Sequence, residues 1–201
     1  MPVPDFTSLA TFPTFSTLPS ASSSSSDDDT QPPSSSSSSA TQYFLLAQIK
    51  ENMTITRPTL ICTDLSGQDF ALMFIGSIDF AARGLKKGCT VVVPNARRTE
   101  SAKKEGGQGW VVVEEGDFGG VRSLPGGGGD VVRLLGRRRE EEDGDRKRCS
   151  WCGKEEGEGR LMKCSRCGEV RYCSKECQAI AWKDGHKGDC KLMKAMREVW
   201  P

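Results

Sequence analysis

The chain has little of several features that would place it in a common protein class. It has a single histidine, and aromatic residues make up only 7% of its 201 residues. The first basic residue is Lys50, so the start lacks the basic and apolar segments of a secretory leader. Its longest apolar stretches, such as residues 43–47 and 71–75, are too short to span a bilayer. We therefore expect an intracellular protein, in the cytoplasm or the nucleus, with no membrane partner.

What the chain does have is a cluster of cysteines. Seven of its 9 cysteines fall between Cys149 and Cys190, and only Cys62 and Cys89 lie elsewhere. Such clustering indicates either a metal site or a disulfide framework. In a reducing compartment clustered cysteines bind metal more often than they form disulfides, and seven is an odd number for pairing. Cys62 and Cys89 lie in strand-like runs, where we expect them to be small buried hydrophobic residues.

Residues 1–42 are dominated by serine, threonine, proline and aspartate, with serine runs at residues 22–26 and 34–39. This composition offers too little apolar surface to offset the entropy of ordering, so we predict a disordered N-terminal tail. A spacer is the favoured interpretation. The alternative is a phosphorylatable acidic tail, because an aspartate triplet lies between the serine runs.

From residue 43 to residue 135 the pattern changes to short apolar runs rich in β-branched residues. Glycine-containing turns at residues 64–67, 86–88 and 106–107 separate several of these runs. The predicted strands are residues 43–49, 59–62, 70–75, 90–93, 110–113 and 131–135. Five or six strands in this length predict a small β-barrel or sandwich, with one short helix at residues 77–83.

The order of these strands, with an Asp-x-x-Gly turn after the second, resembles an OB-fold. The expected fold is therefore a small β-rich, OB-like domain in residues 43–135. OB-folds often bind single-stranded nucleic acid through exposed aromatic residues and a basic groove. Here the aromatic residues fit the core instead, since Phe70, Phe74 and Phe80 lie in apolar runs.

Several basic residues of this domain gather in one glycine-containing connection. They are Arg97, Arg98, Lys103 and Lys104. A solvated loop is the favoured interpretation of this cluster, so we do not expect a nucleic-acid partner. A nucleic-acid-binding regulator that uses the OB-like domain is the alternative function.

Three further segments complete the predicted organisation. Glycine-rich residues 125–130 are predicted to be a flexible connection, and residues 136–148 a solvated charged linker. Residues 191–201 form a helix-compatible C-terminal extension. We expect its apolar face to pack against the rest of the protein. That face carries Leu192, Met196 and Val199.

Eight potential metal ligands lie in residues 149–190 with the spacing C-x2-C-x11-C-x2-C-x5-C-x3-C-x8-H-x3-C. They are Cys149, Cys152, Cys164, Cys167, Cys173, Cys177, His186 and Cys190. A C-x2-C pair sits on a tight turn that aims both sulfurs at one zinc ion, and Gly153 and Gly168 suit such turns. The i, i+4 spacing of the last two pairs puts both ligands on one helical face. For the third pair we predict a helix over residues 174–182 with Ser174 as its N-cap.

Eight ligands complete two tetrahedral sites, so we predict two structural Zn²⁺ ions. Catalytic zinc keeps a position open for water, and these sites leave none. No second histidine accompanies His186 as a general base, and the sequence shows no nucleophile–base pair or phosphate-binding glycine motif. We therefore expect no enzyme activity. The segment is too short to build its own core, so zinc should supply most of its folding free energy.

Residues 149–190 resemble a MYND-type zinc finger in features beyond the ligands. These features are Arg171-Tyr172 before the third pair, Gln178 directly after it, and Trp182 ahead of His186-Lys187. The eight-residue interval before the histidine contains Gly185 and resembles a length variant. A RING finger also carries two zinc ions, but it ends in C-x2-C, whereas this segment ends in H-x3-C.

The resemblance implies that the two zinc sites are interleaved. The first and third pairs would hold one ion, through Cys149, Cys152, Cys173 and Cys177. The second and fourth pairs would hold the other, through Cys164, Cys167, His186 and Cys190.

The resemblance also implies a function, because MYND fingers bind partner proteins and several bind short proline-containing peptides. In such members the residues matching Ser165, Gln178 and Trp182 contact the ligand. Gln178 and Trp182 are one helical turn apart, so a ring that can stack on proline lies beside an amide that can bond the peptide backbone. Packing inside the finger is the alternative role of Trp182. We expect a zinc-binding protein–protein interaction adaptor; a SET-domain methyltransferase is disfavoured because the region before Cys149 is too short.

Overall fold

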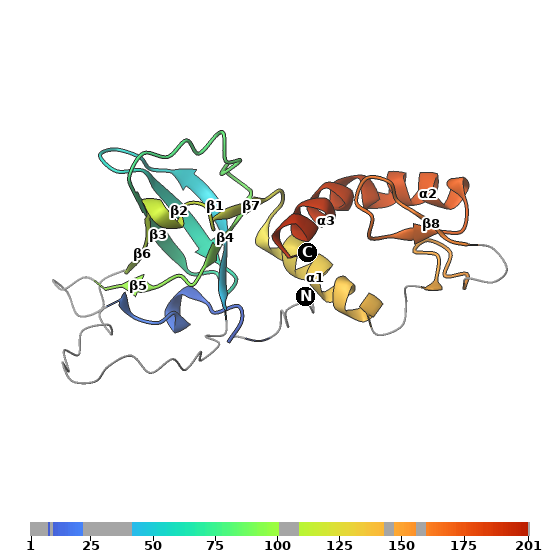
Figure 1. The fold of residues 1–201 in the computed structure, drawn as a ribbon, viewed down its shortest axis with the longest axis horizontal. Helices are drawn as coiled ribbons and strands as arrows, with labels where there is room; N and C mark the ends of the chain where they lie inside the picture. Colours follow the sequence, from blue (N-terminus) through green and yellow to red (C-terminus); the bar gives the residue numbers. More distant parts are fainter. Residues whose placement is uncertain are drawn as a thin grey trace, which may run out of the picture. The chain divides into compact units, whose positions relative to one another are not determined.

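The computed structural model describes residues 8, 10–21, 42–100, 109–142, 147–155 and 160–200. The chain divides into two compact units, Thr7–Ser123 and Leu124–Pro201. Each unit has its own architecture, and Figure 1 shows a sheet in the first and helices around a small hairpin in the second. Among the described residues, no helix combines the length and apolar character needed to cross a membrane.

The first unit is built on a seven-stranded sheet. Its strands are β1 (Phe44–Asn52), β2 (Thr59–Asp64), β3 (Asp69–Ile75), β4 (Thr90–Pro94), β5 (Arg98–Thr99), β6 (Trp110–Glu114) and β7 (Arg122–Leu124). They lie in the order β5-β6-β3-β2-β1-β4-β7. β1 pairs antiparallel with both β2 and β4, β2 pairs antiparallel with β3, and β6 runs parallel to β3. The three-stranded meander flanked by β4 and a parallel β6 agrees with the OB-like prediction.

Alternation along the strands builds the core of this unit. In β2 and β3 every second residue is buried, so Leu60, Cys62, Phe70, Leu72 and Phe74 face the interior. The core positions predicted for Phe70 and Phe74 are confirmed. The Phe80 ring is partly buried and meets the Phe74 ring edge-on at 5.2 Å between centroids.

The two cysteines outside the cluster differ in burial. Cys62 is fully buried, as predicted, and this burial raises the pKa of its thiol to about 12. Cys89 lies just before β4 and is only partly buried. Cys62 is therefore an apolar core residue, whereas Cys89 keeps some exposure to solvent.

The structure differs from the predicted disorder over residues 10–21, which pack on the first unit. Phe12, Phe15 and Leu18 are buried, and the Phe15 ring stacks on the Phe70 ring at 4.7 Å between centroids. The Phe15 backbone N–H donates to Asp64 Oδ2 at 2.8 Å. The prediction averaged composition over residues 1–42 and so missed three large apolar side chains spaced three apart. Apart from residues 8 and 42, the other residues of that predicted tail lie outside the described part of the chain.

The predicted strand at residues 131–135 was wrong, because helix α1 (Gly128–Glu142) occupies this segment. Val131, Leu134 and Leu135 are buried, which is the i, i+3, i+4 spacing of one helical face. A five-residue apolar run does not distinguish a strand from a buried helix segment. Helix α1 also covers part of the predicted flexible connection at residues 125–130 and of the predicted linker at residues 136–148. The helix expected at residues 77–83 is only a turn, with Arg83 N–H donating to the Asp79 carbonyl.

The second unit combines α1 with a two-stranded hairpin and a helical C-terminal part. The hairpin pairs β8 (Met162–Lys163) with β9 (Arg171–Tyr172). Helix α2 (Lys175–Ala181) is followed by a kinked turn (Trp182–His186), in which Gly185 is not helical, and by α3 (Lys187–Val199). Ser174 caps α2, as predicted, since its Oγ accepts the Cys177 N–H. The predicted C-terminal helix is also confirmed, and it begins earlier, at Lys187.

Candidate metal centre

Two tight turns of the second unit each present a C-x2-C pair in the same way. In the first, the Gly153 N–H donates to the Cys149 carbonyl at 2.9 Å. In the second, the Gly168 N–H donates to the Cys164 carbonyl at 2.8 Å. Gly153 and Gly168 have φ angles of 71° and 74°, in the left-handed region that favours glycine. Glycine at these positions, as the sequence predicts, lets the chain reverse directly behind each pair of sulfurs.

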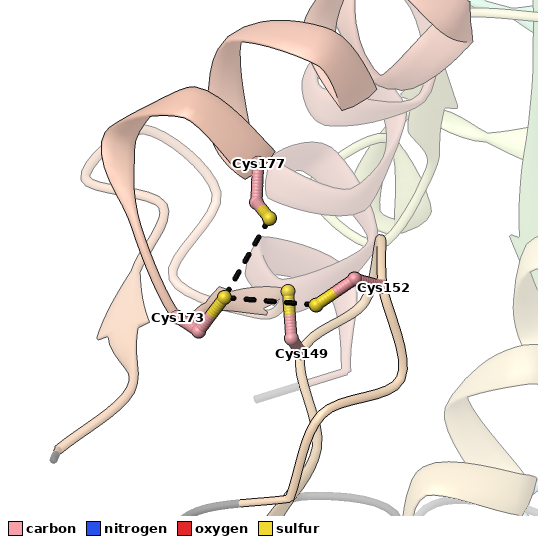
Figure 2. Close-up of side chains that lie close together, drawn as sticks. All are labelled: Cys149, Cys152, Cys173 and Cys177. Atoms are coloured by element: carbon pink, nitrogen blue, oxygen red, sulfur yellow. Dashed lines mark hydrogen bonds between the residues drawn. The ribbon is translucent and has the colours of Figure 1, made fainter.

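The first ligand cluster joins the first cysteine pair to the third. Figure 2 shows the four sulfurs of this cluster, from Cys149, Cys152, Cys173 and Cys177, pointing toward a common centre. Cys173 Sγ lies 3.6 Å from Cys152 Sγ and 3.5 Å from Cys177 Sγ. Cys152 is exposed and Cys173 and Cys177 are partly buried, so this cluster lies near the protein surface.

The second cluster joins the second pair to the fourth, and all four of its residues are buried. It consists of Cys164, Cys167, His186 and Cys190. Cys164 Sγ lies 3.8 Å from Cys190 Sγ and 3.4 Å from His186 Nε2. Cys167 Sγ lies 3.9 Å from the same nitrogen. The interleaving that the family resemblance implies is thereby confirmed.

The donor sets of both clusters fit zinc. A tetrahedral ion with Zn–S bonds of about 2.3 Å places its sulfurs about 3.8 Å apart, close to the observed separations. These separations are far longer than a disulfide bond, and all the cysteines are free thiols. In each cluster the ligand atoms lie within 4.8 Å of one another. Two structural Zn²⁺ ions, one per cluster, account for the whole set of eight ligands.

The backbone of each turn favours the thiolate form of the first cysteine in its pair. Burial alone would raise the pKa of Cys149, but hydrogen bonds from the backbone N–H groups of Trp151, Cys152 and Cys173 bring it down to about 6. Backbone N–H groups of Arg166 and Cys167 likewise lower the pKa of Cys164 against the effect of its burial. Thiolate is the form that binds zinc, so these donors prepare one ligand of each site.

Two further thiols, those of Cys173 and Cys190, ionise less readily than an ordinary cysteine. Hydrogen bonds shared with Cys177 raise the pKa of Cys173 to about 12, and burial raises the pKa of Cys190 to about 12. Several thiolates cannot gather at one point without a cation, and zinc binding therefore releases protons. The clusters are organised for a divalent ion and not for free thiolates.

His186 is held as a neutral ligand. Its Nε2 faces the sulfurs of the second cluster, and burial lowers the pKa of the ring below its ordinary value. The rings of Tyr172 and Trp182 meet the imidazole edge-on, with centroids at 6.0 Å and 5.8 Å. These contacts fix the plane of the ligand ring.

A kink between two helices lies in the eight-residue interval before the histidine. Within Trp182–His186, Gly185 takes a φ of 139° and a ψ of −22°, which is not helical and favours glycine. One helix ends and the next begins at this glycine. His186 therefore reaches the cluster in register with Cys190, one turn further along the helix.

The three predicted peptide-binding residues lie on elements that also carry zinc ligands. Ser165 is exposed in the second cysteine turn. Gln178 is partly buried on α2, and Trp182 is partly exposed at the start of the next turn. The Trp182 ring contacts a zinc ligand, and part of its surface remains open to solvent. The packing role and a contact role for this residue are thus compatible.

The sequence analysis missed three large apolar residues that the finger exposes. These residues are Trp151, Met162 and Ile180. Trp151 lies inside the first C-x2-C pair, Met162 in β8 and Ile180 on α2. The sequence could have indicated two of them as exposed, because Trp151 lies on a tight turn and Ile180 on the solvent side of a short amphipathic helix.

Comparison with known families decides the nature of this centre. The family model of the MYND finger matches residues 149–190. These residues form a MYND finger. The match leaves α1 and most of α3 outside it. A MYND finger is a zinc-binding protein-interaction module, so protein partners follow for this part of the chain.

Comparison of the whole chain adds little beyond the finger. No curated protein matches the chain. Among solved structures, Schizosaccharomyces pombe Pot1pC bound to single-stranded DNA is similar at 13% identity, over 49% of this chain and 88% of that chain. The TM-score is 0.32, a level that does not establish a shared fold.

Proposed function

We propose that this chain is a protein-interaction adaptor whose MYND finger binds proline-containing peptides of partner proteins. The observation that carries the proposal is the closure of both metal sites by protein ligands. A zinc ion with four protein ligands has no position for water or substrate, so the zinc serves the shape of the finger. The function must then lie on the surface that the zinc ions hold in place, and we expect no catalysis.

The surface around Gln178 and Trp182 suits a proline-containing peptide. The two residues are one helical turn apart and both are partly exposed. The Trp182 ring rests edge-on against His186, which orients the ring before any ligand arrives. An oriented indole can stack on a proline ring, and the Gln178 amide can bond the peptide backbone. Ser165 offers an exposed hydroxyl that we assign to the same surface.

The test compares the full-length protein with a Gln178→Ala/Trp182→Ala variant whose content of two zinc ions has been verified by native mass spectrometry. Binding is measured by fluorescence anisotropy against labelled proline-containing peptides and the same peptides with proline replaced by alanine. We expect the variant to lose about tenfold or more in affinity, because aromatic anchors dominate such contacts.

Ile180→Ala is the matched control, since this residue is exposed on the same helix. Binding that needs the proline and survives Ile180→Ala supports the proposal. Equal affinity of the wild type and the double variant would refute it. Affinity purification from the native cell with the same variants would then identify the partners.

The alternative, nucleic-acid binding by the OB-like unit, has less support. Among the described residues of Thr7–Ser123, lysines and arginines are equal in number to aspartates and glutamates. Affinity for nucleic acid depends on an excess of positive charge along the binding surface. A salt-dependent affinity of the full chain for single-stranded DNA would favour the alternative.

A further inference from the structure

Helix α1 lies outside the residues that match the MYND finger, yet it belongs to the same compact unit. It packs alongside α3, as Figure 1 shows. Each helix buries an apolar stripe. The buried residues are Val131, Leu134 and Leu135 on α1, and Leu192, Met193 and Met196 on α3. Because α3 begins directly after His186 and contains Cys190, contact with α3 brings α1 to the element that carries the fourth ligand pair.

A specific ion pair joins the two helices at the level of the ligands. Arg133 of α1 donates to both carboxylate oxygens of Asp189, at 2.7 Å and 3.1 Å. The Asp189 side chain is only 19% exposed, and this residue directly precedes Cys190. A two-pronged guanidinium–carboxylate pair fixes geometry as well as charge. The hydrogen bond to Asp189 also raises the pKa of Arg133, so the guanidinium stays charged.

The charge of Asp189 matters to the second zinc site. A zinc ion with three thiolates and a neutral histidine carries a net charge of −1, and Asp189 adds a negative charge beside it. Arg133 supplies the compensating positive charge from outside the finger.

The C-terminal part of α3 supports the same site from a second direction. The Arg197 guanidinium lies against Gly168, the glycine directly behind the second cysteine turn. Helix α3 thus carries the zinc ligand Cys190, the Asp189 carboxylate that pairs with Arg133, and the Arg197 side chain that lies against the second cysteine turn. Because Cys190 lies on α3 and His186 directly precedes it, the position of α3 determines where these two ligands lie.

We propose that α1 is a supporting element of the second zinc site and that Arg133 is its positioning residue, acting through Asp189. Arg133 bonds to Asp189 and Asp130, and neither of these residues is a ligand. Helix α1 and Arg133 hold α3 in place and offset a negative charge beside the metal. The functional finger therefore extends beyond residues 149–190 to include α1. The inference concerns zinc retention and does not depend on which peptide the finger binds.

The experiment measures zinc loss from the full-length protein during titration with a competing chelator. Co²⁺ substitution separates the sites, because a four-thiolate site and a three-thiolate, one-histidine site give different absorption spectra. The variants are Arg133→Gln, Arg133→Lys and Lys191→Gln. Lys191→Gln is the matched control, since it removes the same charge from an exposed residue directly after Cys190.

We expect Arg133→Gln to weaken the second site about tenfold, the scale of effects seen when an outer partner of a metal ligand is removed. The first site should keep its affinity, Arg133→Lys should fall between the wild type and Arg133→Gln, and Lys191→Gln should behave as the wild type. Equal metal retention in Arg133→Gln and Lys191→Gln would overturn the proposal. So would an equal loss from both sites, which would indicate general unfolding.

A second measurement tests the route through Asp189. If Arg133 acts through this carboxylate, Arg133→Gln should have no further effect in an Asp189→Asn background. Additive effects of the two substitutions would show that Arg133 acts by another route and would refute its assignment as the positioning residue.

Discussion

The two units of the chain reach a defined structure by different means. In Thr7–Ser123, alternating strands bury a continuous apolar core that includes Leu60, Phe70 and Phe74. In Leu124–Pro201, short elements converge on two clusters of metal ligands, and an apolar stripe packs α1 against α3. The first unit depends on hydrophobic burial, whereas the second depends on coordination bonds. Removal of one kind of support should therefore damage one unit and spare the other.

The same contrast recurs between the two zinc sites of the finger. The second site has four buried ligands, while Cys152 of the first site is exposed. A buried site releases its metal only when the surrounding elements open, whereas an exposed ligand can exchange directly with solvent and chelators. The two sites have similar donor atoms but differ in the burial of their ligands.

Removal of zinc should give the largest effect. Structural zinc contributes about 10–16 kcal/mol of apparent binding free energy to small zinc modules near neutral pH. A strong chelator should therefore unfold the MYND finger and leave the β-rich unit folded. Amide cross-peaks in a two-dimensional NMR spectrum report both units at once. Loss of cross-peaks from β1–β4 on chelation would contradict the separation of the two units.

The converse substitution is Phe15→Ala in the first unit. Removal of a buried phenylalanine ring typically costs about 3–5 kcal/mol, and the Phe15 ring stacks on Phe70 within the core. We expect the thermal midpoint of the β-rich unit to fall, with two zinc ions still bound to the finger. Ser16→Ala is the matched control, since this neighbour is exposed. A stability equal to that of the wild type would show that residues 10–21 are not part of the folded unit.

A smaller effect should separate the two zinc sites. With limiting alkylating reagent, the cysteines of the first site should react before those of the second, starting at Cys152, by about an order of magnitude in rate. Peptide mass spectrometry after timed quenching identifies the modified residues. Simultaneous modification of Cys152 and Cys190 would show that the two sites open together.

The smallest effect should come from an exposed ion pair of the first unit. Lys50 Nζ lies 2.7 Å from Asp69 Oδ2, and hydrogen bonds from Lys50 and Thr63 lower the pKa of Asp69. A lowered carboxyl pKa stabilises the fold above the ordinary aspartate pKa, and this contribution is lost as pH falls through the folded value. Lys50→Gln should thus lower the melting temperature only slightly at neutral pH and not at all in strong acid. A difference that grows in acid would contradict this account.

The sequence predicted the metal centre well because ligand chemistry leaves a readable spacing. Every one of the eight ligands was assigned, and the cap at Ser174 and the glycines behind the cysteine turns followed from local backbone requirements. The interleaving of the pairs did not follow from spacing and required the family resemblance. Contacts such as Cys152 with Cys173 join residues that only the folded chain brings together.

Two elements could not be predicted because their structure depends on distant partners. The apolar run at residues 131–135 is compatible with either a strand or a helix. In the folded chain it is helical and its helix packs against α3. Residues 10–21 share serine, threonine and proline with the sequence that follows them, and their three apolar side chains are ordered by contacts with residues far along the chain, such as Asp64 and Phe70. Neither dependence is visible in a local window of sequence.

The kink at Gly185 bears on how this chain is aligned with other MYND fingers. Two helices meet at this glycine, whose backbone angles are not helical, so a residue gained or lost in the turn need not rotate the helix that follows. Insertions and deletions between Cys177 and His186 should therefore be tolerated at the kink. An alignment gap in this interval is a poor reason to exclude a sequence from the family, whereas a gap between His186 and Cys190 would separate two ligands that must share one face.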